Sequence, residues 1–288
     1  MQNFINDTRA TINSTQMASQ QETTTFNSTQ FILSLPSSVW HETLFPFSIL
    51  VTLHAIYVNL KYKACLKNAQ VSWLQGFFSL MIMTVGGSST SAILTGNAPS
   101  WLASNTTMTT YLWIYSMMFY FPNFHQYFTS IPSFILDPIL LTADGFIRAN
   151  AIYSSGVDHI RFGKHYNPSL NTSWVAILIC GTLCGCGGGL WESTFQLASP
   201  KWTFCTPPAF LNPTHDMKMS FITTLFYALT TSNIQLPIMS FTPLLDIDQG
   251  RALATFVFIG LNLIKLKDPT HIRYSQDTKN IENKDKVQ

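Results

Sequence analysis

The longest stretch without a charged side chain is the feature that most constrains this sequence. Residues 68–136 contain no Asp, Glu, Lys or Arg over 69 consecutive positions. No soluble domain could cover its surface with such a stretch, because charged groups keep folded proteins in water. Charged residues make up 10% of the whole chain, against about 25% in typical soluble domains. We therefore interpret the sequence as an all-α polytopic membrane protein.

Seven apolar segments are candidates for membrane-spanning helices. A helix needs roughly 20 residues to cross a hydrocarbon core of about 30 Å. We expect helices at residues 43–60, 71–94, 108–121, 133–153, 174–197, 219–236 and 252–264. The seventh segment covers only about 20 Å at 1.5 Å per residue. We therefore expect Arg251 and Lys265, which flank it, to extend to the two membrane interfaces.

The distribution of basic residues predicts the orientation. Lys61, Lys63 and Lys67 follow the first segment, and a lysine-rich tail at 268–288 follows the seventh. Because cytoplasmic loops carry an excess of Lys and Arg, we expect a cytoplasmic carboxy terminus and a luminal amino terminus. The polar head, residues 1–40, and the tail are expected to be disordered. N-glycosylation sequons support the luminal assignment, and the candidate acceptors are Asn6, Asn13, Asn27 and Asn105.

Two halves of the chain share a spacing of glycine, proline and tryptophan. Gly86-Gly87 precedes Pro99-Ser-Trp101, and Gly187-Gly188-Gly189 precedes Pro200-Lys-Trp202, at a common offset of 101 residues. We infer that a three-helix unit is duplicated and that a seventh helix is appended. The corresponding ranges are 41–123, 130–237 and 244–267. Because three is odd, the second copy enters the membrane from the opposite side, and such inverted repeats are typical of transport proteins.

Glycines in the second and fifth predicted helices allow two interpretations. Residues 180–189 contain five glycines, which in water would cost a helix roughly 5 kcal/mol relative to alanine. They indicate close helix packing, an unwound hinge that exposes backbone carbonyls to a pore, or both together. The candidate pore or hinge residues are Gly86, Gly87, Gly181, Gly185, Gly187, Gly188 and Gly189.

The fourth predicted helix carries charges well inside its length. Asp144 and Arg148 are four residues apart, the spacing at which an acid and a base meet on one helix face. They form either a structural ion pair or a functional site in which Arg148 lines an aqueous cavity or binds a lipid phosphate.

His54 is interpreted as a packing residue. We find no catalytic motif, no metal-ligand set and no basic face for nucleic acid, and we expect the five cysteines to be free thiols.

Several motifs together resemble one family of membrane proteins. They are Arg148-Ala-Asn-Ala-Ile-Tyr with Gly156-Val-Asp-His, Gly181-Thr-Leu-Cys-Gly-Cys-Gly, and Lys218-Met-Ser-Phe-Ile-Thr-Thr-Leu-Phe-Tyr-Ala-Leu. Their order and spacing are similar to helices four, five and six of the trimeric intracellular cation (TRIC) channels. The resemblance covers about residues 44–266. It implies a homotrimer of the endoplasmic or sarcoplasmic reticulum or the nuclear membrane, with one pore in each subunit between the inverted repeats. It also implies conduction of monovalent cations, chiefly potassium, as counter-current to calcium release.

The same resemblance bears on cofactors. In the family, a Lys-Glu motif and a following Arg on the fourth helix contact a phosphoinositide headgroup. Arg148 stands at that Arg, but Asp144 and Gly145 replace the Lys and Glu, and Cys184 replaces a lysine between the fifth-helix glycines. These replacements argue against a phosphoinositide cofactor, and we expect no other cofactor and no metal.

Two other classes of protein fit part of the pattern. An alternating-access carrier would have the same inverted repeat, and it would saturate with solute where a channel passes current without saturation at low concentration. A seven-helix receptor would share the helix count and orientation. The duplicated triplet argues against the receptor, because receptor helices are not copies of one another.

Overall fold

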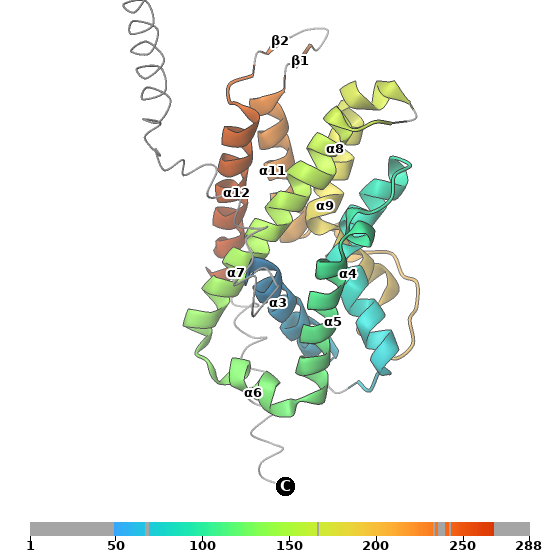
Figure 1. Cartoon of the computed structure of the whole chain (residues 1–288), viewed down its shortest axis with the longest axis vertical. Coiled ribbons are helices and arrows are strands. Elements are labelled where there is room, and N and C mark those ends of the chain that lie inside the picture. The colour runs from blue at the N-terminus through green and yellow to red at the C-terminus, as the bar shows by residue number, and fades with distance from the viewer. Residues whose placement is uncertain are drawn as a thin grey trace, which may run out of the picture.

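The computed structural model describes residues 49–66, 69–165, 167–232 and 243–267, together with two short strands at 234–235 and 240–241. These residues form long helices that pack side by side (Figure 1). Several predictions lie outside the described residues. They concern the head at 1–40 with Asn6, Asn13 and Asn27, the start of the first helix, and the tail at 268–288.

The helices follow one another with short connections. In the first half they are α3 (Ile49–Leu66), α4 (Trp73–Leu94), η2 (Ser100–Ala103), α5 (Asn105–Tyr120) and α6 (Pro122–Ser130). In the second half they are α7 (Ser133–Asn150), η3 (Ala151–Asp158), α8 (His159–Phe162), η4 (Pro168–Thr172), α9 (Trp174–Phe195), α10 (Pro208–Leu211), α11 (His215–Thr231), α12 (Ile247–Leu263) and η5 (Ile264–Lys267).

Four of the long helices begin with the same device. A Ser or Thr immediately before the helix accepts a hydrogen bond from the backbone N–H three residues later, which satisfies one of the unpaired donors of the first turn. The capping residues are Ser72 for α4, Ser104 for α5, Ser173 for α9 and Thr214 for α11. The sequence therefore determines where these helices start.

The first described helix is longer than predicted at its carboxyl end. It was expected to end at residue 60, but α3 continues through Lys61 and Lys63 to Leu66. Lysine is a good helix former, and Lys63 extends its Nζ to the carbonyl oxygen of Met118 at 3.4 Å. These lysines are therefore part of the helix and do not form the loop that was predicted.

The fourth predicted helix is also longer than expected. It was expected to end around residue 153, but α7 passes into the π-helical segment η3 and then into α8, so one continuous helix runs from Ser133 to Phe162. Gly156 lies within it, and the α-carbon of Gly181 in α9 occupies the place where a side chain on Gly156 would stand. Asp158 therefore lies within a helix, five residues beyond the expected end of this helix.

The sixth predicted helix is shorter than expected. Helix α11 ends at Thr231, whereas the sequence analysis extended it to residue 236. The carbonyl oxygen of Thr230 accepts hydrogen bonds from the N–H groups of Leu244 and Leu245, at 2.9 and 3.0 Å. Strands β1 (Ile234–Gln235) and β2 (Ser240–Phe241) pair antiparallel in this connection, so the otherwise helical fold includes one very short hairpin.

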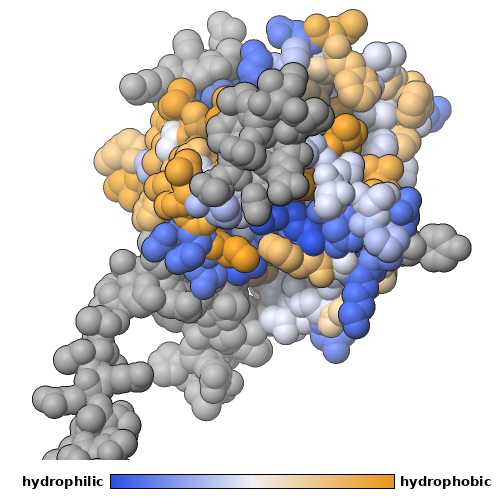
Figure 2. Space-filling view, turned by 90° about the horizontal axis from the view of Figure 1, so that it is seen from above, coloured by the Kyte–Doolittle hydropathy of each residue, from blue (hydrophilic) through white to orange (hydrophobic). Residues whose placement is uncertain are grey.

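Three described helices are long and apolar enough to cross a membrane by length and composition. They are α4, α9 and the segment Ile247–Leu266, and the bent pair of α6 with α7 would make a fourth. Helices α5 and α11 have only 16 and 17 residues, so this measure does not reproduce the predicted count of seven. Figure 2 shows hydrophilic residues across the middle of one end of the molecule and hydrophobic residues at its left and upper right.

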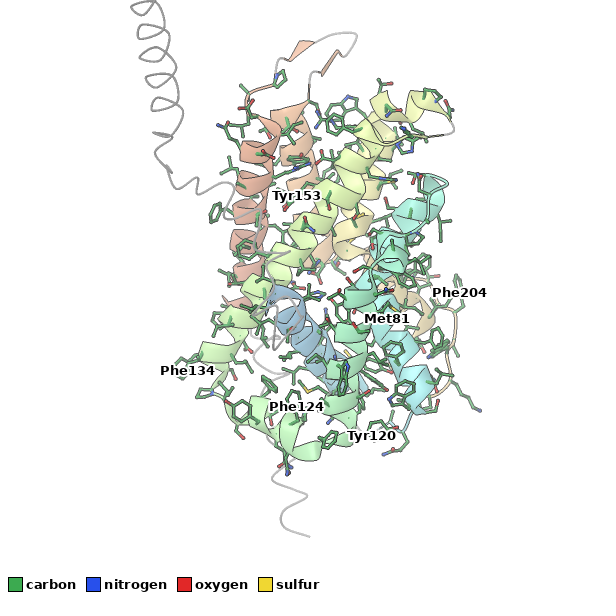
Figure 3. The ribbon with its side chains drawn as sticks, viewed as in Figure 1. Met81, Tyr120, Phe124, Phe134, Tyr153 and Phe204 are labelled. Carbon is green, nitrogen blue, oxygen red and sulfur yellow. The ribbon has the colours of Figure 1, made fainter. Side chains whose placement is uncertain are left out.

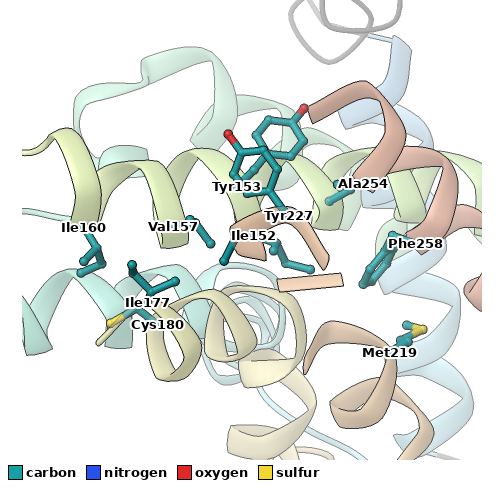
Figure 4. Close-up of a cluster of buried hydrophobic side chains, with 12 residues drawn as sticks. Ile152, Tyr153, Val157, Ile160, Ile177, Cys180, Met219, Tyr227, Ala254 and Phe258 are labelled. Atoms are coloured by element: carbon teal, nitrogen blue, oxygen red, sulfur yellow. The ribbon is translucent and has the colours of Figure 1, made fainter. Parts of the chain in front are cut away.

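The largest core cluster lies in the second half of the chain. It joins the α7–α8 helix to α9, α11 and α12 (Figure 4). Tyr153 and Tyr227 meet there with ring centroids 5.8 Å apart, and Phe258 of α12 is fully buried. Helix α12 therefore packs as part of the second half of the chain.

Candidate functional site

Helices α4 and α9 make the closest helix contact of the molecule. The α-carbon of Gly87 lies where a side chain on Gly187 would stand, and backbone carbonyls lie where side chains on Gly87 and Gly188 would stand. These carbonyls belong to Leu183 and Met83 respectively. Only glycine permits two backbones to approach this closely.

The glycine sites match one of the two interpretations made from the sequence. Both α4 and α9 are continuous α-helices through their glycines, so the structure contains packed helices here and not the unwound hinge that was considered. In α9, Gly181 and Gly185 face Thr224 and Ser220 of α11. Gly86 faces Trp191, and Gly189 has open space beside it. A role for these glycines along a pore stays a prediction.

Asp144 is the centre of a buried polar cluster. This carboxylate is 2% exposed, and donors from three helices contact it. His54 Nε2 lies 3.3 Å from Oδ1, while Arg148 Nη1 and Asn262 Nδ2 lie 3.3 and 3.0 Å from Oδ2. The predicted Asp144–Arg148 ion pair is therefore present, and α3 and α12 supply two further partners. A buried carboxylate needs such donors, because it has lost its hydration.

Arg148 links this carboxylate to a second one. Its Nη1 lies 2.9 Å from Oδ1 of Asp216 at the start of α11, and its Nε donates to the carbonyl oxygen of Gly185 at 2.6 Å. Lys265 contacts the same Asp216 oxygen at 2.6 Å. We call Asp144, Arg148, Asp216 and Lys265, with His54 and Asn262, the Asp144 cluster. Its two carboxylates and two cations balance when His54 is neutral.

Two members of the Asp144 cluster correct the sequence analysis. His54 was interpreted as a packing residue, but it bridges Asp144 and the hydroxyl of Tyr111, which lies 2.6 Å from Nδ1. Lys265 was expected to extend to the interface, but its side chain is 13% exposed and turns inward to Asp216. Because these partners come from α3, α5, α11 and η5, no local spacing indicated them.

A second buried carboxylate lies towards the other end of the bundle. Asp158 accepts hydrogen bonds from the hydroxyl of Tyr227 at 2.8 and 2.9 Å and from Arg251 at 2.9 and 3.0 Å. Arg161 approaches it at 3.9 Å and donates to Thr231. Arg251 was expected to extend to the interface, but it binds Asp158 instead. We call Asp158, Arg161, Tyr227 and Arg251 the Asp158 cluster.

Hydroxyl groups line α4 between these two clusters. Trp191 donates from Nε1 to the hydroxyl of Thr90 at 2.7 Å, and Trp101 donates to Ser89 at 2.8 Å. Ser91 donates to the carbonyl of Ser155 at 3.4 Å. The charge-free helix α4 therefore presents hydroxyl oxygens to the interior of the bundle.

The remaining candidates can be located directly. None of the five cysteines, all of which the structure describes, takes part in a disulfide, as expected. Within the part of the chain that the structure describes, no group of three or more His, Cys, Asp or Glu side chains could hold a metal ion. Asn105 is an exposed residue at the start of α5, and its glycosylation stays a prediction.

Comparison with known proteins gives consistent matches. The family model described as TRIC channel matches residues 63–245. A curated relative from Xenopus laevis, trimeric intracellular cation channel type B-B, is 27% identical over 194 residues. That alignment covers 65% of this chain and 63% of the relative, so it spans less than two thirds of the relative's length.

Solved structures show the same fold. A structure from a study of TRIC counter-ion channels in calcium release has a TM-score of 0.59 at 22% identity, and the match covers 78% of this chain and 95% of that one. A trimeric intracellular cation channel from C. elegans with bound Ca²⁺ has a TM-score of 0.58 at 19% identity, covering 74% of this chain and 88% of that one.

Proposed function

This chain belongs to the TRIC channel family, whose model matches residues 63–245, and from that premise we propose how it works. Proteins of this family are membrane channels and not enzymes. We propose that this chain conducts monovalent cations, chiefly potassium, across the endoplasmic or sarcoplasmic reticulum or the nuclear membrane. The current would supply counter-ions during calcium release, and the working unit would be a homotrimer. The family match is the observation that carries this proposal.

The proposed pathway runs within each subunit, between two inverted three-helix repeats. Helices α3, α4 and α5 make one repeat, the α7–α8 helix with α9 and α11 makes the other, and α12 is the seventh helix. Contacts between α4 and α9 support this arrangement. Each helix places a glycine, Gly87 or Gly188, against a carbonyl of the other. Thr90 and Trp191, which are hydrogen-bonded, are separated by the repeat offset of 101. When a two-fold axis relates two repeats, equivalent residues of the repeats contact each other only where they lie next to that axis.

The polar interior supports conduction of cations. A cation that leaves water needs oxygen ligands to replace its hydration shell. Carbonyl and hydroxyl oxygens are present at the α4–α9 contact, and Arg148 of the Asp144 cluster binds the carbonyl oxygen of Gly185 in the same part of α9. In both clusters basic side chains already bind the carboxylates, so these carboxylates do not offer free ligands to a cation in this structure. We propose that rearrangement of these ion pairs accompanies opening.

Basic residues support the proposed orientation. Lys63, Lys201, Lys218, Lys265 and Lys267 lie at one end of the bundle, near the end of α3, the end of α9, the start of α11 and the end of α12. The opposite end carries Arg161, Lys164 and Arg251. The excess of lysine favours the first end as cytoplasmic, which gives a luminal amino terminus and a cytoplasmic carboxy terminus.

The Asp144 cluster also bears on lipid dependence. Arg148 is bound by two carboxylates and one carbonyl oxygen within the chain. These acceptors engage Nε and Nη1 of the guanidinium, and the two carboxylates already balance the charge that would attract a phosphate group. We propose that the channel functions without a phosphoinositide cofactor. Soluble phosphoinositide should therefore leave the open probability of the wild-type channel unchanged in a planar bilayer, and a requirement for the lipid would refute this part of the proposal.

A flux assay tests the proposed function and separates it from the carrier alternative. Purified full-length protein is reconstituted into vesicles loaded with potassium, and efflux is followed at increasing potassium concentration. A channel gives efflux that rises in proportion to concentration over the low range. Efflux that saturates at low concentration would indicate an alternating-access carrier, and efflux equal to that of empty vesicles would refute both.

A further inference from the structure

Helix α6 differs from the other helices in its direction. Residues 123–130 meet the helix Ser133–Phe162 at an angle of 106°. Proline begins α6 at Pro122, and Pro132 precedes α7. Because proline disfavours continuation of a helix, these two residues separate α6 from α5 and from α7. Helix α6 connects the two at the lower end of the bundle in Figure 1.

The two faces of α6 have different surroundings. Phe124 and Phe128 pack inward onto Met118 and Leu140, with ring centroids 5.2 Å from each other. Tyr127, on the other face, is 66% exposed. Further exposed aromatic rings flank the helix on both sides, namely Tyr120, Phe121 and Phe134. Exposed aromatic side chains at this density are unfavourable in water.

The absence of charge around α6 is equally informative. Residues 121–136 contain no Asp, Glu, Lys or Arg, although the neighbouring ends of α3, α11 and α12 carry lysines. A loop exposed to water at this end would be expected to share the charged character of its neighbours.

The length of α5 bears on the position of α6 in the membrane. Its 16 residues extend about 24 Å, less than the hydrocarbon thickness of about 30 Å. Helix α5 alone is therefore too short to cross the hydrocarbon core, and α6 follows it directly. At that depth, tyrosine rings occupy the preferred position, because their apolar body faces lipid and their hydroxyl faces water.

We infer that α6 lies in the plane of the membrane, at the boundary between headgroups and acyl chains of the leaflet on the lysine-rich side. Its outer face binds lipid, and its inner face closes the first half of the bundle. Figure 3 shows Tyr120 and Phe134 on opposite sides of this end with Phe124 between them. Exposed aromatic side chains that extend from one side of this end to the other fit a surrounding leaflet better than one flat contact with a second copy of the chain.

Spin labelling of the full-length protein in vesicles tests this inference. Replacing Cys65 and Cys205 with Ser removes the two partly exposed thiols and leaves the three buried ones of α9. A nitroxide is then attached through Tyr127→Cys, and collision rates with oxygen, which concentrates in lipid, are compared with those of a water-soluble nickel chelate. The matched control is Lys201→Cys, an exposed position at the same end of the bundle.

The inference predicts an oxygen-to-nickel collision ratio severalfold higher at Tyr127→Cys than at Lys201→Cys. The ratio should remain below that of Phe256→Cys, which is exposed near the middle of α12. A ratio equal to that of the Lys201 variant would place α6 in water and overturn the inference. Low collision rates with both reagents would indicate a protein interface and would also overturn it. Phe134→Cys provides a second position in case the Tyr127 variant does not fold.

Discussion

Replacing Asp144 with Asn tests whether the Asp144 cluster stabilises the fold. The substitution keeps the size of the side chain but removes a negative charge that is 2% exposed. Three donors contact this carboxylate, from His54, Arg148 and Asn262, at 3.0 to 3.3 Å. The substitution leaves one acid, Asp216, against two bases, Arg148 and Lys265.

The expected loss follows from these contacts. Breaking a buried ion pair costs about 3 to 5 kcal/mol when one charge is left without a partner. Arg148 keeps Asp216 at 2.9 Å, and the amide oxygen of Asn can still accept one hydrogen bond. The expected loss is therefore at the lower end, about 3 kcal/mol of unfolding free energy.

Reversible unfolding in mixed micelles, titrated with a denaturing detergent, measures this loss. The matched control is Asp248→Asn, which removes an exposed acid that lies 3.3 Å from Arg251. It should cost less than about 1 kcal/mol, as exposed ion pairs do. If Asp144→Asn changes stability by no more than about 0.5 kcal/mol, the range of ordinary surface substitutions, the reasoning about this cluster is wrong.

Three further predictions concern the helix contact and the two clusters. Gly188→Ala places a methyl group against a backbone carbonyl and should cost about 1 to 3 kcal/mol. Gly189→Ala meets open space inside α9 and should stabilise by up to about 1 kcal/mol in the same unfolding titration. Equal effects of the two would contradict the packing interpretation. Tyr227→Phe removes the hydroxyl that donates to Asp158 and should cost about 1.5 to 3 kcal/mol of unfolding free energy in that titration. If stability does not fall, the hydroxyl contributes nothing to it. Arg148→Gln leaves two carboxylates against one lysine in its cluster and should change the open probability in planar bilayers. Identical single-channel records from the variant and the wild type would exclude a role in gating.

The sequence predicts the features that depend on local pattern. Absence of charge over residues 68–136 indicated membrane helices, and the i, i+4 spacing of Asp144 and Arg148 indicated their ion pair, which the structure contains. The shared glycine spacing pointed to α4 and α9, which make the close contact. The ion pair is visible from neighbouring residues, the membrane helices from one continuous stretch, and the glycine contact from a spacing that recurs 101 positions later in the same sequence.

The remaining features depend on contacts between distant residues. Asp144 and Asn262 are separated by 118 positions, and Asp158 and Arg251 by 93. Because Asp158 has these partners, it can lie inside a helix where an isolated carboxylate would not. A single sequence contains no signal for such pairing. For the same reason it predicted that Arg251 would extend to the membrane interface.

Ion preference in a planar bilayer tests the central claim most directly. Purified full-length protein is inserted between chambers that hold a gradient of potassium chloride, and the voltage of zero current is measured. The account predicts discrete single-channel currents that reverse near the equilibrium potential of potassium. Currents that reverse near the chloride potential, or a bilayer that stays silent when protein insertion is verified, would contradict it.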